Sequence, residues 1–382
     1  MSAAANQSAS TSTVRDMDWI AAVRFAVGAA VAVIVPSILL LKAGGYDAGL
    51  ALEALWNGSL GSSYALTSAT LVRAVPLILA GLAVALAFRT GVFNIGAEGQ
   101  LLIGATASAM IGVKLSGVLS VLTLPAELVA GAIAGAFWAG IAAWLRSRFR
   151  VLEVISTIML NFVGLHAVGY LVRGPLQEPL RIYPQSDVLP DIARMPRLID
   201  GTRLHWGLVA AVGAAVLLWW VLRYTATGFR LRASGANPHG ARSAGLIDVS
   251  RVTAAAFLVS GALAGLAGAV ELTGVTFALY ENISPGYGYT AIAVALLARL
   301  NPLAVIATGF FFGALEAGAS AMQRDAGVPA AFVSVVEAGI VLAVIAFDRL
   351  EAARGQGSTA RSGGQDVPHA PRAPGTPRAS TS

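Results

Sequence analysis

The chain has 382 residues, of which 56% are hydrophobic and 12% charged, with a formal net charge of +6. An average soluble domain carries about 25% charged residues, so the composition favours the lipid bilayer over water as solvent. The absence of cysteine excludes disulfides and cysteine-ligated metals, and the four histidines lack metal-ligand spacing, so we expect no cofactor. Neither lysine completes a GxxxxGK phosphate loop, which assigns any ATP binding to another polypeptide.

Apolar segments follow a Ser/Thr/Ala-rich tail, residues 1–18, that is expected to be disordered and cytoplasmic. About ten of them are candidates for transmembrane helices, two being short. They cover residues 19–41, 65–88, 98–113, 118–145, 154–172, 206–222, 252–270, 287–297, 303–321 and 330–347. The sequence therefore predicts an all-α polytopic membrane helix bundle over residues 19–350, followed by a disordered cytoplasmic tail, 351–382.

The basic residues favour an orientation with both termini in the cytoplasm, because it places fourteen of them inside and nine outside. In this topology residues 173–205 form an external loop and residues 223–251 a cytoplasmic coupling loop. The external loop contains five prolines, which predict an extended or structured cap rather than a helix. It either docks an external partner or only closes one rim of the bundle.

Two sequence repetitions bear on how the helices are arranged. Residues 79–83 and 263–267 both read Leu-Ala-Gly-Leu-Ala, as expected for an inverted repeat, although coincidence is an alternative in so apolar a chain. Small residues with GxxxG spacing, at Gly131/Gly135, Gly261/Gly265 and Gly309/Gly313, predict close helix packing.

Polar residues interrupt the apolar pattern near residues 88–100. Asn94, Glu98 and Gln100 lie there among glycines that permit a broken helix, and such breaks in membrane proteins line substrate paths. We favour this interpretation over an ordinary loop at the inner surface. Replacing Asn94 or Glu98 with leucine is then expected to abolish uptake while assembly persists.

A second interruption, residues 277–289, falls at the corresponding place in the second half. Tyr280, Glu281, Asn282 and Tyr287 combine aromatic faces with hydrogen-bonding groups, which suit a flat base or a sugar. An aromatic belt at the outer membrane surface is the alternative.

The cytoplasmic loop contains a short predicted helix, which Asn237 caps, Pro238 begins and Gly245 ends. A short helix on the surface suits a groove on a soluble subunit. Arg230 and Arg232 are expected to contact anionic lipids in addition. The residues predicted to couple this chain to an ATPase are Arg232, Asn237, Pro238, Ala241, Arg242 and Gly245.

The remaining carboxylates near helix ends are each interpreted as caps or as side chains that reach the interface: Glu153, Glu271, Glu316 and Glu337. The sequence contains no paired-carboxylate or Ser/His/Asp arrangement, so we expect no enzymatic catalysis.

Four stretches resemble the permeases of ABC importers for nucleosides and simple sugars, which belong to the branched-chain amino acid and ribose permease superfamily. They are residues 91–100 (GVFNIGAEGQ), 153–161 (EVISTIMLN), 228–245 and 288–302 (GYTAIAVALLARLNP). The resemblance extends from about residue 73 to residue 347. Residues 237–245 match the coupling helix, with Gly240 where a helix former is more usual, and Asn94, Glu98 and Gln100 match the translocation side.

The resemblance implies a multi-pass protein of the bacterial cell membrane that forms half of a translocation pathway by alternating access. Its implied partners are two ATP-binding subunits, a second related permease and an external binding lipoprotein of the basic membrane lipoprotein type, together with membrane lipids but not nucleic acid. The alternative is a proton-coupled secondary transporter of a small polar solute. That protein would use its intramembrane glutamates and need no ATPase.

Overall fold

The computed structural model describes residues 35, 37–243, 247–329, 331–340, 342, 343 and 346. Both predicted tails and most of the predicted first helix lie outside these residues, as does Gly245. Residues 37–43, which include the end of that predicted helix, are helical and are followed by a turn at residues 44 and 45. The helices below all belong to one unit, Val35–Val341.

The described residues are helical apart from connecting segments and two isolated β-bridges. The elements are α2 (Ala48–Ser59), α3 (Ser63–Ala65), η1 (Leu66–Thr70), α4 (Leu71–Arg89), α5 (Ala97–Leu119), η2 (Ser120–Leu122), α6 (Thr123–Phe149), α7 (Glu153–Val172), η3 (Asp191–Ala193), α8 (Gly207–Tyr224), α9 (Ala226–Ala236), α10 (Pro238–Ser243), α11 (Val249–Glu271), η4 (Leu272–Thr276), α12 (Tyr287–Leu297) and α13 (Pro302–Asp325), with a further helix at Ala331–Ile340. Seven helical stretches in the described part of the chain are long and apolar enough to cross a membrane. The all-helical fold class is therefore confirmed.

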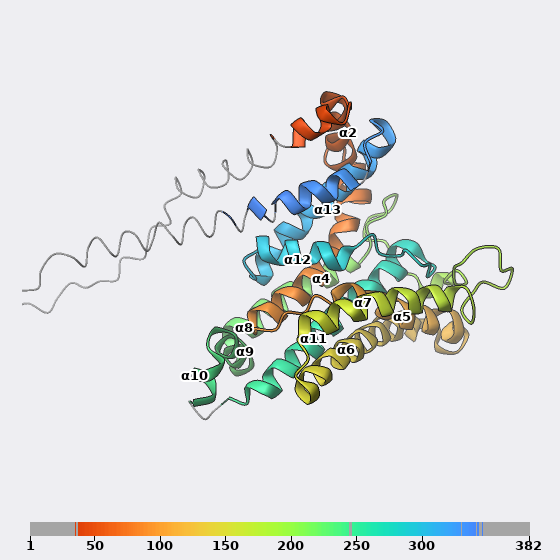
Figure 1. The fold of residues 1–382 in the computed structure, drawn as a ribbon. Coiled ribbons are helices and arrows are strands. Elements are labelled where there is room, and N and C mark those ends of the chain that lie inside the picture. Colours follow the sequence, from red (N-terminus) through yellow and green to blue (C-terminus); the bar gives the residue numbers. More distant parts are fainter. Residues whose placement is uncertain are drawn as a thin grey trace, which may run out of the picture. The chain divides into compact units, whose positions relative to one another are not determined.

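Helix α4 lies at the centre of the bundle, between α12 and α13 on one side and α11 on the other (Figure 1). Most of its side chains are fully buried, and they form the largest hydrophobic cluster together with residues of α8, α11, α12 and α13. Helices α5 and α6 pack beyond α11, and α7 packs on α5. Only α4 is enclosed in this way, since its most apolar stretch is 83% buried whereas no other described span exceeds 50%.

Glycines set the separation of α6 and α11, as the spacing predicts. A methyl group on Gly135 would collide with the backbone of Gly261 and Gly265, and one on Gly265 would collide with the carbonyl of Gly131. Because lipid is as apolar as the side chains, membrane helices associate through van der Waals contacts, and backbones this close increase the number of such contacts. The third pair acts in the same way, because Gly309 and Gly313 pack against α4.

Residues 173–206 contain only the short helix η3 and are held against the segment that follows α11. The amides of Ser186, Leu189 and Met195 donate to carbonyl oxygens at residues 279, 277 and 273, over 2.7, 2.7 and 2.9 Å respectively. The prediction of a structured, non-helical cap is confirmed. This cap lies at the end of the bundle opposite α9 and α10, because α7 and α8 run to it and back.

One predicted helix limit was wrong, and one helix was missed. The sequence pattern started a helix at residue 118, but α5 continues to residue 119 and α6 begins at Thr123. Both flanks are apolar, so hydropathy alone does not mark this turn. Helix α2 was missed because it is short; Asp47 caps it by accepting bonds from the amides of Gly49 and Leu50 at 2.8 and 3.1 Å.

Candidate functional site

The first interruption is a non-helical segment, residues 90–96, that enters the interior of the bundle between α4 and α5. Asn94 at its centre is fully buried and faces Ser260, which lies midway along α11. Asn161, midway along α7, holds the same segment by donating to Ile95 O at 2.9 Å and accepting from the Gly99 amide at 2.8 Å. Helix α5 therefore starts deep within the bundle, as expected for the broken helix predicted from sequence.

Every hydrogen-bonding atom of the Asn94 amide has a partner. Its nitrogen donates to Gln100 Oε1 at 3.0 Å and Ser260 Oγ at 2.9 Å. Its oxygen accepts from the Gly96 amide and from Gln100 Nε2, each at 2.9 Å. Ser260 Oγ in turn donates to the carbonyl of Ala83 in α4 at 2.7 Å. This network ties α4, α5 and α11 together.

The second interruption meets the first at the start of α12. The amide of Gly288 donates to Glu98 Oε2 at 2.7 Å, and the two backbones approach so closely that Gly288 has no room for a methyl group. A carboxylate at a helix N-terminus is stabilised by unpaired amides and by the helix dipole. Glu98 therefore fixes the first turn of α12, which carries Tyr287.

A polar cavity of about 400 Å³ lies at the cap end, between α4, η4, α13 and the second interruption. We call it the Arg73 cavity. Three of the predicted contact residues, Tyr280, Asn282 and Tyr287, line it. The others are Ser68, Val72, Arg73, Arg203, Glu271, Val275, Thr276, Ile283, Pro285, Glu316 and Ser320.

The other predicted contact residues lie elsewhere. Asn94, Glu98 and Gln100 are buried and do not line the Arg73 cavity. Glu281 forms an ion pair with Arg173 at the end of α7 instead. The structure thus separates the predicted set into residues that line the Arg73 cavity and residues whose polar groups contact other parts of the bundle.

Sequence reasoning missed the charged groups of the Arg73 cavity. Glu271 and Glu316 were each interpreted as an isolated cap or as a side chain that reaches the interface, but both line this cavity together with Arg73. Arg73 donates from Nη2 to Ser320 Oγ at 3.1 Å, and Glu271 Oε2 is buried without a hydrogen-bond partner among the described residues. One arginine and two glutamates within apolar spans were the available signal.

His205 is buried where the cap returns to α8. Its Nδ1 accepts from the Gly207 amide at 3.2 Å, and its ring packs against Gly274 of η4. Burial, with the neighbouring charge of Arg203, lowers the pKa of His205 to about 4. The imidazole is therefore neutral at physiological pH.

The opposite end of the bundle carries the predicted coupling residues. Helix α10 begins at Pro238, and Asn237 Oδ1 accepts from the Gly240 amide at 2.9 Å, which confirms the predicted capped helix. Asn237, Pro238 and Arg242 are exposed, whereas Ala241 is buried against the bundle. Arg232 in α9 lines a separate hollow with Arg89 of α4.

The chain matches known transporters over most of its length. The family described as the branched-chain amino acid transport system permease component matches residues 66–345. The chain belongs to this family. The permease is 42% identical to the glucose ABC transporter permease protein of Haloferax volcanii, over 75% of this chain and 77% of the relative. It is 38% identical to the guanosine ABC transporter permease protein of Bacillus subtilis (80% and 88%) and 32% identical to the nucleoside ABC transporter permease protein of Lactococcus lactis (79% and 85%).

These relatives make the chain an integral membrane subunit of an ABC transporter, and they favour this function over a proton-coupled secondary transporter. A multi-pass membrane location agrees with the seven candidate spans in the described residues. Permeases of this kind move solute rather than catalyse a reaction. The family also implies ATP-binding subunits and substrate-binding proteins as the permease's partners.

Proposed function

We propose that the permease forms half of the translocation pathway for a nucleoside or a simple sugar, and that the Arg73 cavity contributes to this pathway. The observation that carries the proposal is the meeting of Tyr280, Asn282 and Tyr287 around one polar cavity of about 400 Å³. Small-molecule sites typically measure about 300–1,000 Å³. Tyrosine rings suit a base or the apolar face of a sugar, while amide and carboxylate groups bind hydroxyls.

The two interruptions support alternating access at this place. Because Glu98 holds the first turn of α12, a shift of α5 moves Tyr287 and changes the cavity. The Asn94 network links the same region to α4 and α11. In this proposal Asn94, Glu98 and Gln100 act by positioning helices, and the tyrosines and Asn282 contact the solute.

The proposed topology has ten transmembrane helices with both termini inside, which places the cap outside and α10 in the cytoplasm. An external binding lipoprotein would then deliver solute at the cap end, and the ATP-binding subunits would move α10. The matching residues 79–83 and 263–267 lie on α4 and α11, which are in contact. The two helices run in opposite directions, because the end of α4 and the start of α11 border the same cavity. That placement supports an inverted repeat. A second related permease completes the pathway.

The test compares two exposed tyrosines, one that precedes α12 and one in its first turn. Tyr280 lines the Arg73 cavity and Tyr289 does not, yet their exposed fractions are similar, 37% and 45%. In cells that carry the complete transporter, Tyr280→Leu should raise the solute concentration for half-maximal uptake about two- to tenfold, the effect of one lost aromatic contact. Guanosine and glucose are tested as separate solutes.

Tyr289→Leu is the matched control and should leave uptake unchanged. Copurification of the ATP-binding subunits checks that both variants assemble. If both variants transport like the parent, the Arg73 cavity does not lie on the pathway. If the purified chain alone takes up solute in a pH gradient without ATP-binding subunits, the proton-coupled alternative replaces the proposal.

A further inference from the structure

A second cavity, of about 460 Å³, lies at the α10 end of the bundle. We call it the Arg146 cavity. It is a partly open cavity bordered by the end of α6, the end of α9, α10 and the first turns of α11, with Thr90 and Gly91 also in its wall. Its polar lining side chains include Arg146, Ser147, Ser234, His239, Arg242 and Thr253.

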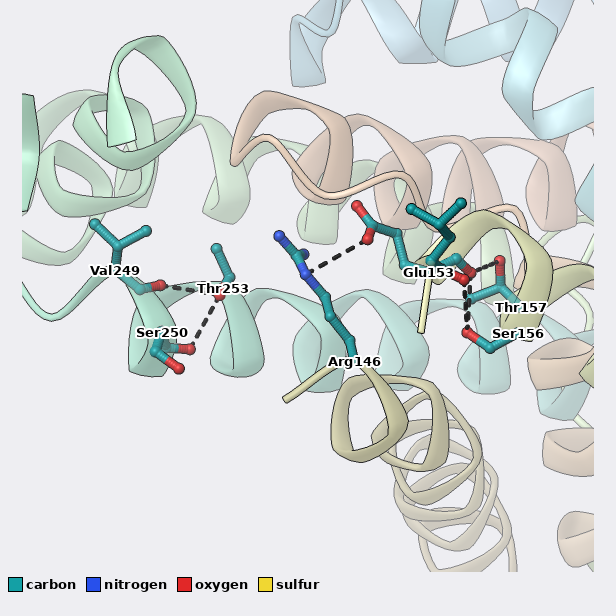
Figure 2. A network of polar contacts seen from close by, with 8 residues as sticks. Arg146, Glu153, Ser156, Thr157, Val249, Ser250 and Thr253 are labelled. Atoms are coloured by element: carbon teal, nitrogen blue, oxygen red, sulfur yellow. Dashed lines mark hydrogen bonds and ion pairs between the residues drawn. The ribbon is translucent and has the colours of Figure 1, made fainter. Parts of the chain in front are cut away.

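Two buried groups in this wall lack partners among the described residues. Ser234 is 2% exposed, and its hydroxyl makes no hydrogen bond. Arg146 Nη1 is also buried and unpaired, while Arg146 Nε faces Glu153 Oε2 at 3.4 Å. Figure 2 shows this arginine extending from α6 toward Glu153. Leaving such donors unsatisfied is costly, so a cavity lined by two of them indicates a ligand that accepts hydrogen bonds.

The charge of the lining is positive. Arg146 and Arg242 line the cavity, whereas no carboxylate among the described residues does. Glu153 pairs with Arg146 at 3.4 Å and Asp248 pairs with Arg251 at 3.0 Å, so among the described residues Arg242 is the lining arginine without an ion pair. The N-terminus of the 23-residue helix α11, at Val249, also forms part of the wall, where Asp248 caps it by accepting from the Arg251 amide at 3.1 Å.

From these contacts we infer that the Arg146 cavity binds the phosphate group of a phosphoester. A phosphate offers more acceptor oxygens than a carboxylate, which suits a cavity whose donors come from α6, α9 and α10. The cavity is larger than a phosphate alone, and Ala254 and Phe257 give its wall an apolar part for the esterified group. The site lies where α6 ends and α11 begins, so the phosphoester is either a phospholipid head group or a soluble molecule. The site shares no lining residue with the Arg73 cavity.

The experiment uses the complete purified transporter in a neutral detergent without nucleotide. Glycerol 3-phosphate is titrated while thermal unfolding is followed, with glycerol and sodium chloride at matched ionic strength as the reference. The parent should show a saturable rise in the unfolding midpoint. Arg146→Gln should weaken the apparent affinity by at least about tenfold, the effect of losing a charged hydrogen bond.

The matched control is Arg251→Gln, which removes an exposed arginine at the same end of α11 that does not line the cavity. It should bind like the parent. If Arg146→Gln fails to assemble, Ser234→Ala takes its place. Its affinity for glycerol 3-phosphate should fall several-fold if the Ser234 hydroxyl binds the phosphate. An unchanged affinity would mean that this hydroxyl does not contact the ligand. Equal responses in the cavity and control variants, or no saturable response, overturn the inference.

Native mass spectrometry then separates the two sources. Phosphatidylglycerol that stays bound to the parent and to Arg251→Gln but not to Arg146→Gln assigns the site to a lipid head group. Binding of glycerol 3-phosphate without selective lipid retention assigns it to a soluble phosphoester. Either result supports the phosphate site.

Discussion

Replacing Asn94 with leucine tests whether the first interruption holds the bundle together. The change removes the four hydrogen bonds of the Asn94 amide and leaves the Gly96 amide and the Gln100 side chain without those partners. Hydrogen bonds within membrane proteins average about 0.6 kcal/mol each. Each buried polar group left unsatisfied costs about 1–3 kcal/mol. Four lost bonds at the first figure, or two unsatisfied groups at the lower end of the second, reduce the free energy of unfolding by about 2 kcal/mol. The upper end of the second figure gives about 6 kcal/mol.

The sequence interpretation expects assembly to survive this replacement, whereas the network predicts that it weakens. At the lower bound of about 2 kcal/mol, the unfolding midpoint of the purified transporter should fall by about 2 °C or more, because a chain of 382 residues has a large unfolding entropy. Asn57→Leu is the control, because Asn57 is exposed on α2. Its midpoint should stay close to that of the parent.

A double variant separates hydrogen bonding from packing. Removing both partners with Asn94→Leu and Gln100→Leu leaves fewer unsatisfied groups, so the combined loss should be smaller than the sum of the two single losses. Midpoints for Asn94→Leu that match the parent, or losses that simply add, would refute the proposed role of the network.

Other parts of the structure give further expectations. Gly265→Val should destabilise the permease by about 1–3 kcal/mol or more, because the new side chain would collide with the carbonyl of Gly131. The control is Gly213→Val, which should fold normally because no heavy atom lies within 4 Å of the added group. The yield of assembled transporter is measured for both variants. Acidification from about pH 6.5 to pH 4 should destabilise the protein by about 3 kcal/mol through His205, because its lowered pKa lets only the unfolded chain take up the proton in this range. Thermal unfolding from pH 7.5 to 4.5 should therefore show a smaller decline in a His205→Gln variant. Asn237→Ala should loosen α10 by about 1 kcal/mol and lower solute uptake, measured at equal membrane abundance.

The sequence predicts those features of the fold, such as helix limits and caps, that depend on residues close together along the chain. Helix α12 has the predicted limits, Tyr287–Leu297, and the Asn237 cap forms where Asn-Pro indicates it. Hydropathy measures the length of an apolar stretch, and a cap involves residues within one helical turn. Helix limits and caps can therefore be predicted from short segments of sequence. The broken helix before α5 is predictable for the same reason, since glycines and polar residues mark it.

What the sequence does not reveal is which distant residues meet. Arg73, Glu271 and Glu316 lie on three helices that are far apart along the chain, and only the packing of α4, α11 and α13 brings their side chains to one cavity. The pairing of Glu98 with the Gly288 amide joins residues separated by 190 positions. Separate caps and a shared cavity give the same local pattern, so only tertiary structure distinguishes them.

The enclosure of α4 has a consequence for how the protein is made. Helices α8, α11, α12 and α13, which surround it, are all synthesised after it. Until they arrive, α4 has to remain stable as a single span exposed to lipid, and its apolar composition fits that stage as well as the finished core. A polar substitution tolerated in the mature interior would then act earlier, by impairing the insertion of a nascent chain.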